Sequence, residues 1–407
     1  MIKTSTPKYS LKQLFFYFIR LGAIGFGGPV ALVNYMHRDL VEKRKWISED
    51  DYKEGLALSQ LAPGPLAAQL GIYIGYVDYR IIGATLAGFA FILPSFLIVV
   101  VLGFLYVLYG GLPWMQAVFY GVGAAVIGII AVSGYKLTKK TIGKDWLLWI
   151  IFFVLAVDTF LTEGENIWLI LGAGFVTWFI KARPKFTHTQ NVFLIPFFLQ
   201  ITDQTSYNEK LFQIAFFFLK AGAFVFGSGL AIVPFLYGGV VKEHQWLTDR
   251  QFLDAVAVAM ITPGPVVITV GFIGYLIAGF PGACVAALAT FLPCYLFTIL
   301  PAPYFKKYGK NPALKAFIDG VTAAAVGAIA GAVIVLAKRQ FIDIPSVLIA
   351  AVAAFILIQF KKVQEPFIIL AAALLGLLIK SWVTIQYIKN SCFLKFENNR
   401  LGYPHLF

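Results

Sequence analysis

The chain has 407 residues, of which 59 % are apolar, 16 % are aromatic and only 13 % are charged. A soluble domain carries roughly 25 % charged residues, so this composition leaves too little polar surface for a water-soluble globule. It excludes a soluble enzyme, a disordered chain, a collagen and a coiled coil. The long apolar stretches predict an all-α polytopic membrane protein rather than a β-barrel.

The formal net charge is +13, from 33 Lys and Arg against 20 Asp and Glu. Cytoplasmic loops of membrane proteins are rich in basic residues, so we expect a lipid bilayer as the partner and no nucleic acid. The three cysteines and four histidines form none of the usual metal or cofactor motifs. We therefore expect no catalytic residue, no cofactor and no metal.

Apolar stretches of roughly 15 to 30 residues recur along the chain, each about long enough to cross a hydrocarbon core. They cover residues 13–36, 56–78, 81–109, 114–136, 146–161, 166–180, 211–240, 252–277, 279–304, 313–337, 344–360 and 366–388. A short apolar island at 192–200 lies within the polar stretch that separates the two groups.

An internal repeat organises these segments. Residues 18–71 align with 218–271 at a shift of 200 without a gap, and 14 of the 54 positions are identical. Beyond a one-residue deletion the shift becomes 199. Such duplication is a common plan of secondary transporters. The expected units are an N-terminal repeat at 1–185, a linker at 186–204, a C-terminal repeat at 205–390 and a polar tail at 391–407.

Loop charge predicts that the two repeats have opposite orientations. Loop 37–55 is rich in Lys and Arg and its partner 241–254 is not, whereas the loop near 110 is uncharged and its partner at 306–315 is basic. By the positive-inside rule, a basic loop that changes place between the halves indicates inversion. Three loop pairs change in this way, and one pair, 136–144 with 338–339, is basic in both halves. Inversion needs an odd number of crossings between equivalent points. Either the island at 192–200 crosses, or a segment broken by glycine or proline turns back.

Two glycine- and proline-rich motifs occur in both halves at the same register. They are the Gly25–Pro29 cluster with its partner at 226–229, and Pro63-Gly64-Pro65 with Pro263-Gly264-Pro265. Such residues break helices, and inside a membrane a broken helix must be buried or line a watery cavity. The amides exposed at helix N-termini attract anions. We therefore expect an anion site made of Gly27, Gly28, Pro63, Gly64, Pro65, Gly227, Ser228, Pro263, Gly264 and Pro265.

Polar side chains near these breaks are further substrate-binding candidates. Arg20 and Lys220 are repeat partners inside apolar segments, where a cation is costly, and they can face an anion or extend to the interface. Gln69 and its partner Thr269 follow the Pro-Gly-Pro motifs and can orient an oxyanion or bond between helices.

A charged cluster follows the first segment, with His37, Arg38 and Glu42 as candidates for gating or proton relay. Histidine changes charge near neutral pH. A solvated cytoplasmic surface is the alternative interpretation, because Arg38 and Glu42 are spaced as a helical ion pair.

Together these motifs resemble the chromate ion transporter family over nearly the whole chain, as in its long two-domain members. The resemblance rests on Phe-x-x-(Arg/Lys)-x-Gly-Ala-x-x-Phe-Gly, on His37-Arg38-Asp39-Leu40-Val41-Glu42-x-x-x-Trp46 and on Pro-Gly-Pro. It places Arg20, Gly27, Gly28, Pro29, His37, Arg38, Glu42, Trp46, Pro63, Gly64, Pro65 and Gln69 on the family's N-half pattern. In the C-half, Ser228 and Gly229 replace Gly-Pro, and no His-Arg-Asp equivalent is present.

The resemblance implies a secondary transporter that exports chromate from the bacterial cytoplasm, with inverted halves, in the inner membrane. It also implies a link to sulfate, a tetrahedral dianion of similar size. A sulfate or other anion transporter of unknown direction is the alternative function, and an intramembrane enzyme is a remote one. A homodimer is one candidate for the oligomeric state.

Overall fold

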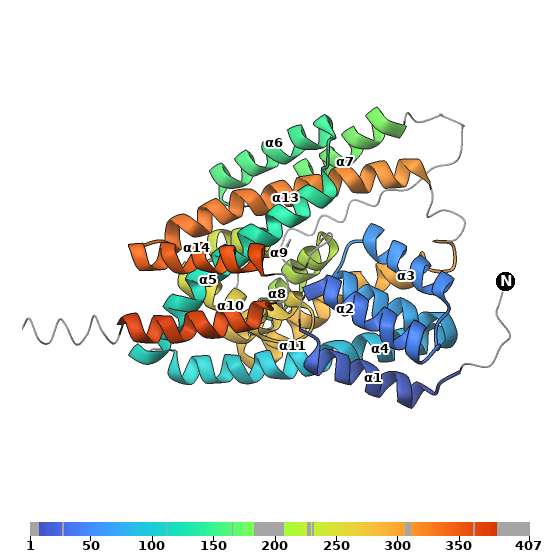
Figure 1. Ribbon diagram of the computed structural model, residues 1–407, viewed down its shortest axis with the longest axis horizontal. Coiled ribbons are helices and arrows are strands. Elements are labelled where there is room, and N and C mark those ends of the chain that lie inside the picture. Colours follow the sequence, from blue (N-terminus) through green and yellow to red (C-terminus); the bar gives the residue numbers. More distant parts are fainter. Residues whose placement is uncertain are drawn as a thin grey trace, which may run out of the picture.

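The computed structural model describes residues 8–26, 28–110, 112–164, 166–182, 207–225, 229, 232–305, 311–360 and 363–380, and the regular elements in these ranges are helices (Figure 1). The N-terminal half contains α1 (Leu11–Ile24), α2 (Gly28–Met36), the π-helix η1 (His37–Lys43), α3 (Glu49–Leu61), α4 (Leu66–Tyr109), α5 (Pro113–Thr141), α6 (Trp146–Thr162) and α7 (Ile167–Ala182). The C-terminal half contains α8 (Tyr207–Ala223), α9 (Ile232–Leu236), the π-helix η3 (Tyr237–Glu243), α10 (Asp249–Ile261), the short 3₁₀-helix η4 (Val266–Ile268), α11 (Thr269–Ile299), α13 (Pro312–Gln340) and α14 (Ile344–Gln359). Residues 365–380 form one more helix.

The sequence repeat is also a structural repeat. The π-helices η1 and η3, like helices α3 and α10, begin and end 200 residues apart, and α5 and α13 are 199 apart. Even unusual backbone conformations recur: Lys45 and Gln245 have positive φ angles of 52° and 50°. A non-glycine residue rarely adopts this conformation, so its recurrence at one register shows that both halves have the same local path.

Helix α4 consists of two antiparallel arms, residues 66–79 and 81–109. The chain reverses at Arg80, whose φ of 53° and ψ of −137° are not helical. A Cβ atom on Gly75 would lie 2.2 Å from the carbonyl oxygen of Gly83, so the arms touch through glycine. Helix α11 reverses in the same way at Ala278–Gly279.

The glycine- and proline-broken segments turn back instead of crossing. In the first, Tyr9 before α1 stacks on Trp46 after η1, with ring centroids 4.6 Å apart, so both ends of the segment lie together. In the second, a Cβ on Gly55 of α3 would lie 2.3 Å from the Tyr73 ring of α4, and the Tyr79 hydroxyl donates a hydrogen bond to the Tyr9 carbonyl. We call the shared end, formed by Tyr9, Trp46 and Tyr79, the N-base.

This hairpin geometry bears on how many of the predicted segments cross the membrane. Segments 13–36 and 56–78 are long enough to cross, yet each is a hairpin whose tip is its glycine or proline motif. The second alternative, a crossing by the island at 192–200, lies outside the described residues, as do the linker at 186–204 and the tail at 391–407.

Within the described residues, four stretches are long and apolar enough to span a membrane: Leu66–Tyr109, Pro113–Thr141, Val266–Ile299 and Pro312–Gln340. Equivalent helices in this set run antiparallel. The Thr85 hydroxyl is 2.7 Å from the Tyr295 hydroxyl, and Phe96 meets Phe280 with ring centroids 6.4 Å apart. As residue numbers increase along the arm 81–109, the residue numbers of its contacts in α11 decrease, so these two equivalent helices are antiparallel. Inverted repeats require this arrangement.

The halves are also interlaced. Helices α6 and α7 of the first half pack on α13 of the second, while α14 packs on α5. Close glycine contacts make this packing possible: a Cβ on Gly327 of α13 would lie 2.3 Å from the Phe152 carbonyl oxygen of α6. Glycine at such contacts lets helix backbones approach closely in a membrane.

An ion-pair network joins the halves at the end opposite the N-base. Glu163, after α6, pairs with Lys242 after α9, and its Oε2 lies 2.6 Å from an Arg339 nitrogen. Arg339 also donates to Asp249 at 2.5 Å. We call this end the C-base; it is separated from the N-base along the chain by the arm 81–109, α5 and α6 (Figure 1).

Candidate functional site

The four hairpin tips meet at one place between the halves. The Gly64 amide donates a hydrogen bond of 2.5 Å to the Val225 carbonyl, and the Gly264 amide donates one of 3.0 Å to the Gly25 carbonyl. Each Pro-Gly-Pro tip therefore bonds to the break in the first hairpin of the other half. The two bonds are related by the same shift of 200, and we refer to them as the interlock.

The tips adopt this form because of their glycines and prolines. Gly64 and Gly264 have φ angles of 140° and 91°, which only glycine adopts readily. Helix α3 ends at Leu61 and α4 begins at Leu66, directly after Pro65, which as N-cap offers no side-chain bond. The first amides of α4 therefore have no partner within their own helix, and they carry partial positive charge.

A cavity of about 10 Å³ lies at the interlock. It is lined by Pro29, Leu32, Pro65, Leu66, Ala67, Gly229, Gly264, Pro265 and Val266. Such a volume holds about one water molecule, so a tetrahedral dianion does not fit while the tips are closed.

Of the predicted substrate-binding residues, the structure brings the two Pro-Gly-Pro turns together. Gly28 begins α2 with a φ of 73°, and a Cβ there would have no neighbour within 4 Å. Gly27, Gly227 and Ser228 lie outside the described residues.

Gln69 is fully buried beside the interlock. Its Nε2 donates to the Pro63 carbonyl at 2.7 Å, while its Oε1 is buried without a hydrogen-bond partner. Exchanging the two amide atoms would set two acceptors against each other, so this orientation is preferred. Gln69 therefore braces the Pro-Gly-Pro turn. Its partner Thr269 donates to the Val266 carbonyl at 2.8 Å.

Arg20 and Lys220 do not line the cavity. Both side chains are exposed, and the Lys220 ammonium lies 4.2 Å from the centroid of the Phe216 ring. The cause is helical periodicity: Leu14, Phe18 and Leu21 form the buried face of α1, and Arg20 points away from it.

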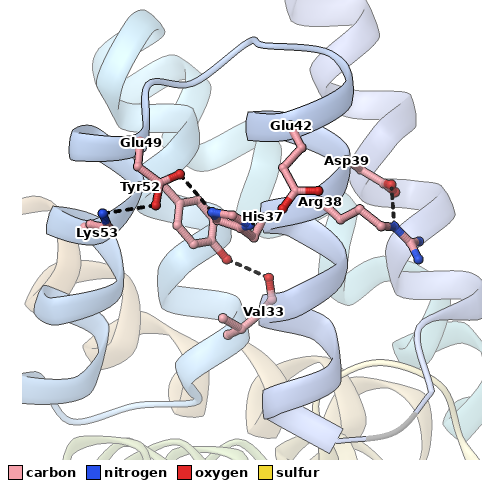
Figure 2. A network of polar contacts seen from close by, with 8 residues as sticks. All are labelled: Val33, His37, Arg38, Asp39, Glu42, Glu49, Tyr52 and Lys53. Carbon is pink, nitrogen blue, oxygen red and sulfur yellow. Dashed lines mark hydrogen bonds and ion pairs between the residues drawn. The ribbon is translucent and has the colours of Figure 1, made fainter.

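His37 and its neighbours lie at the N-base, away from the tips, and Figure 2 shows their contacts. The His37 Nε2 is 2.9 Å from Glu49, and its Nδ1 is 3.2 Å from Glu42. Arg38 instead bonds to Asp39 at 3.4 Å, so the predicted Arg38–Glu42 pairing is replaced by others. The hydrogen bond from His37 is the main cause that lowers the pKa of the Glu49 carboxyl, with Lys53 adding to it.

The sequence interpretation missed the C-half equivalent of this contact. Tyr237 stands 200 residues after His37, and its hydroxyl donates to Asp249, the equivalent of Glu49, at 2.6 Å. The alignment at a shift of 200 that identified the glycine motifs also pairs His37 with Tyr237 and Glu49 with Asp249. The Arg339 network at the C-base carries no local sequence signal, because its members are far apart in the chain.

Comparison with known proteins gives one family. The family model described as chromate transporter matches residues 12–178 and 212–377. The chain is 67 % identical over 377 residues to a chromate transport protein of Cupriavidus metallidurans, covering 92 % of this chain and 94 % of the relative. A chromate transport protein of Pseudomonas aeruginosa is 31 % identical over 396 residues, covering 92 % and 93 % respectively.

A shorter Bacillus subtilis transporter is 30 % identical over 179 residues, which are 42 % of this chain and 88 % of the relative. A relative of about half the length agrees with the internal duplication. No solved structure matches the chain. Because the family model covers both halves separately and long relatives match almost end to end, the chain belongs to the chromate transporter family.

Proposed function

We propose that this multi-pass membrane transporter is a secondary transporter that exports chromate from the cytoplasm through the inner membrane, with its two halves inverted. The interlock carries the proposal. Amides and carbonyls of both halves meet there, and in secondary transporters the substrate lies at the interface of repeats, beside broken helices.

In this account the interlock is the closed state of the anion site. When the tips separate, the amides of Gly64 and Gly264 lose their carbonyl acceptors and become free to donate to an oxyanion. The helix N-terminus after Pro65 adds partial positive charge. Relative rocking of the halves would open the tips towards one base and then the other.

Arg20 and Lys220 would act on the approach to this site. Each is five residues before the interlock carbonyl of its own half, Gly25 or Val225, roughly 7.5 Å along a helix. Their exposure allows them to meet an anion when the hairpins part.

Export is the direction that the membrane potential favours. Moving a dianion out of a cytoplasm that is negative by about 100 mV releases about 4.6 kcal/mol. The N-base would face the cytoplasm, because its loop carries Arg38, Lys43, Arg44, Lys45 and Lys53.

The test is uptake of radiolabelled chromate into inside-out vesicles, with the potential set by a potassium gradient and sulfate as competitor. We expect potential-dependent accumulation, and we expect the double variant Arg20→Gln, Lys220→Gln to abolish it while the protein remains inserted. Absence of chromate uptake by the inserted wild type would refute the proposed function. Unchanged flux in the double variant would refute only the role of the two cations.

A further inference from the structure

Asp254 is a buried carboxyl at the contact between the two halves. It lies in α10, the arm that leads to the Pro263-Gly264-Pro265 tip, and it is 4 % exposed. The Tyr106 hydroxyl, from the arm 81–109 of the other half, donates a hydrogen bond of 2.7 Å to its Oδ2. Tyr106 is itself held by the rings of Phe119 and Phe272, whose centroids are 5.4 and 5.5 Å from its own.

The surroundings of Asp254 are apolar and contain little compensating charge. Asp254 forms no ion pair with any described residue. The charged group near it is Arg250, one turn earlier in α10, which is exposed. The arm 81–109 contributes the Tyr106 hydroxyl, and the rings of Phe119 from α5 and Phe272 from α11 pack against the Tyr106 ring. Burial without a paired cation disfavours the ionised form of a carboxyl.

The equivalent residue of the N-terminal half has a different environment. Glu54 occupies the register of Asp254, is partly exposed, and lies beside the Tyr73 hydroxyl of its own half. Where Tyr106 stands in one half, the other has Phe305, which packs in a cluster with Leu58 and Tyr73. A carboxyl is thus present in both halves, and the one at 254 is buried and bonded to a tyrosine of the other half.

We propose that Asp254 is a proton-binding site that couples the closing of the tips to proton uptake, so that chromate leaves in exchange for an entering proton. This rests on the proposed function and names its coupling ion. The closed interlock has no room for the anion, and it is in this state that the Asp254 carboxyl is shielded from water and holds a proton. When the halves part, water reaches the carboxylate and the proton leaves to that side.

Exchange in this sense uses both components of the proton-motive force. The anion moves out with the potential, and the empty transporter returns with a proton moving inwards. Because Tyr106 and Asp254 belong to different halves, any separation of the halves changes the hydration of the carboxyl directly.

The transport test uses proteoliposomes of the full chain, loaded with radiolabelled chromate and clamped at zero potential with valinomycin and equal potassium. At one proton per anion, a gradient of about one pH unit should change the final chromate ratio about tenfold. Asp254→Asn should retain chromate–chromate exchange and lose this dependence. Asp254→Glu should restore it, and Glu54→Gln, the matched control, should keep it.

A second measurement does not require transport. The infrared spectrum of the purified protein at neutral pH should contain a protonated-carboxyl band that Asp254→Asn removes and Glu54→Gln retains. Absence of that band, a wild-type chromate ratio independent of the pH gradient, or full dependence in Asp254→Asn would each overturn the inference. A wild type that moves no chromate but shows the band would refute the proposed function and leave the proton site standing.

Discussion

Substituting Gly264 by Ala should weaken one of the two interlock hydrogen bonds, the one from the Gly264 amide to the Gly25 carbonyl. Gly264 has a φ of 91°, and an added Cβ would lie 2.1 Å from the Ser95 Oγ. Backbone strain at such a φ costs about 1–3 kcal/mol. The Ser95 hydroxyl would also have to rotate and lose its 3.4 Å contact with the Gly22 carbonyl, which adds about 1 kcal/mol.

The closed state should therefore be destabilised by about 2–4 kcal/mol. If every transport cycle passes through the interlock, chromate flux in proteoliposomes should fall at least about tenfold. The melting temperature of the purified protein should fall with it. The matched control is Gly143→Ala, which has a positive φ of 55° and open space around its Cβ position. It should lower the melting temperature slightly and leave flux unchanged.

Wild-type flux in Gly264→Ala, with a lowered melting temperature, would refute the claim that the interlock takes part in transport. Equal losses of flux in Gly264→Ala and Gly143→Ala would show that general destabilisation, and not the tip, causes the effect.

Two further predictions concern the bases. Arg339→Gln removes two charge-assisted bonds at the C-base and should destabilise the protein by no more than about 1 kcal/mol, because its partners are partly exposed. The hydrogen bond from Lys242 is the main cause that lowers the pKa of Glu163. The ion-pair network therefore stabilises the protein at pH values above the ordinary carboxyl pKa, and this stabilisation is lost as the pH falls through the lowered pKa. A difference in melting temperature between Arg339→Gln and the wild type that does not change with pH would contradict this. At the N-base, His37→Ala removes the hydrogen bond that chiefly lowers the pKa of Glu49. The melting temperature of the variant should therefore be below that of the wild type at neutral pH and equal to it at a pH where Glu49 is protonated, which melting curves recorded over a pH series will test.

The sequence predicts much of the candidate site, because the motifs that form it occur in both repeats at the same spacing. Equal spacing of two unusual motifs predicted that the Pro-Gly-Pro turns and the glycine breaks form one site, and in the structure the Gly64 and Gly264 amides bond to the breaks of the opposite half. Their backbone conformations are local properties of glycine and proline, which a sequence specifies directly.

Features that depend on distant packing could not be predicted. Length alone cannot tell a crossing helix from a hairpin, so the sequence left two alternatives for the glycine- and proline-broken segments 13–36 and 56–78: they cross, or they turn back. The interlacing of α6 and α7 with α13 depends on surfaces that periodicity does not identify. The exposure of Arg20 and Lys220 required knowing which face of α1 and α8 is buried.

The most direct test of the inverted arrangement compares Lys45 and Gln245, which are equivalent, exposed and located at opposite bases. Each would be replaced singly by Cys in a background without Cys284, Cys294 and Cys392, and labelled in sealed right-side-out and inside-out vesicles with a membrane-impermeant maleimide. We predict that position 45 is labelled only from the cytoplasmic side and position 245 only from the opposite side. Labelling of both positions from the same side would contradict inversion and the alternating-access account built on it.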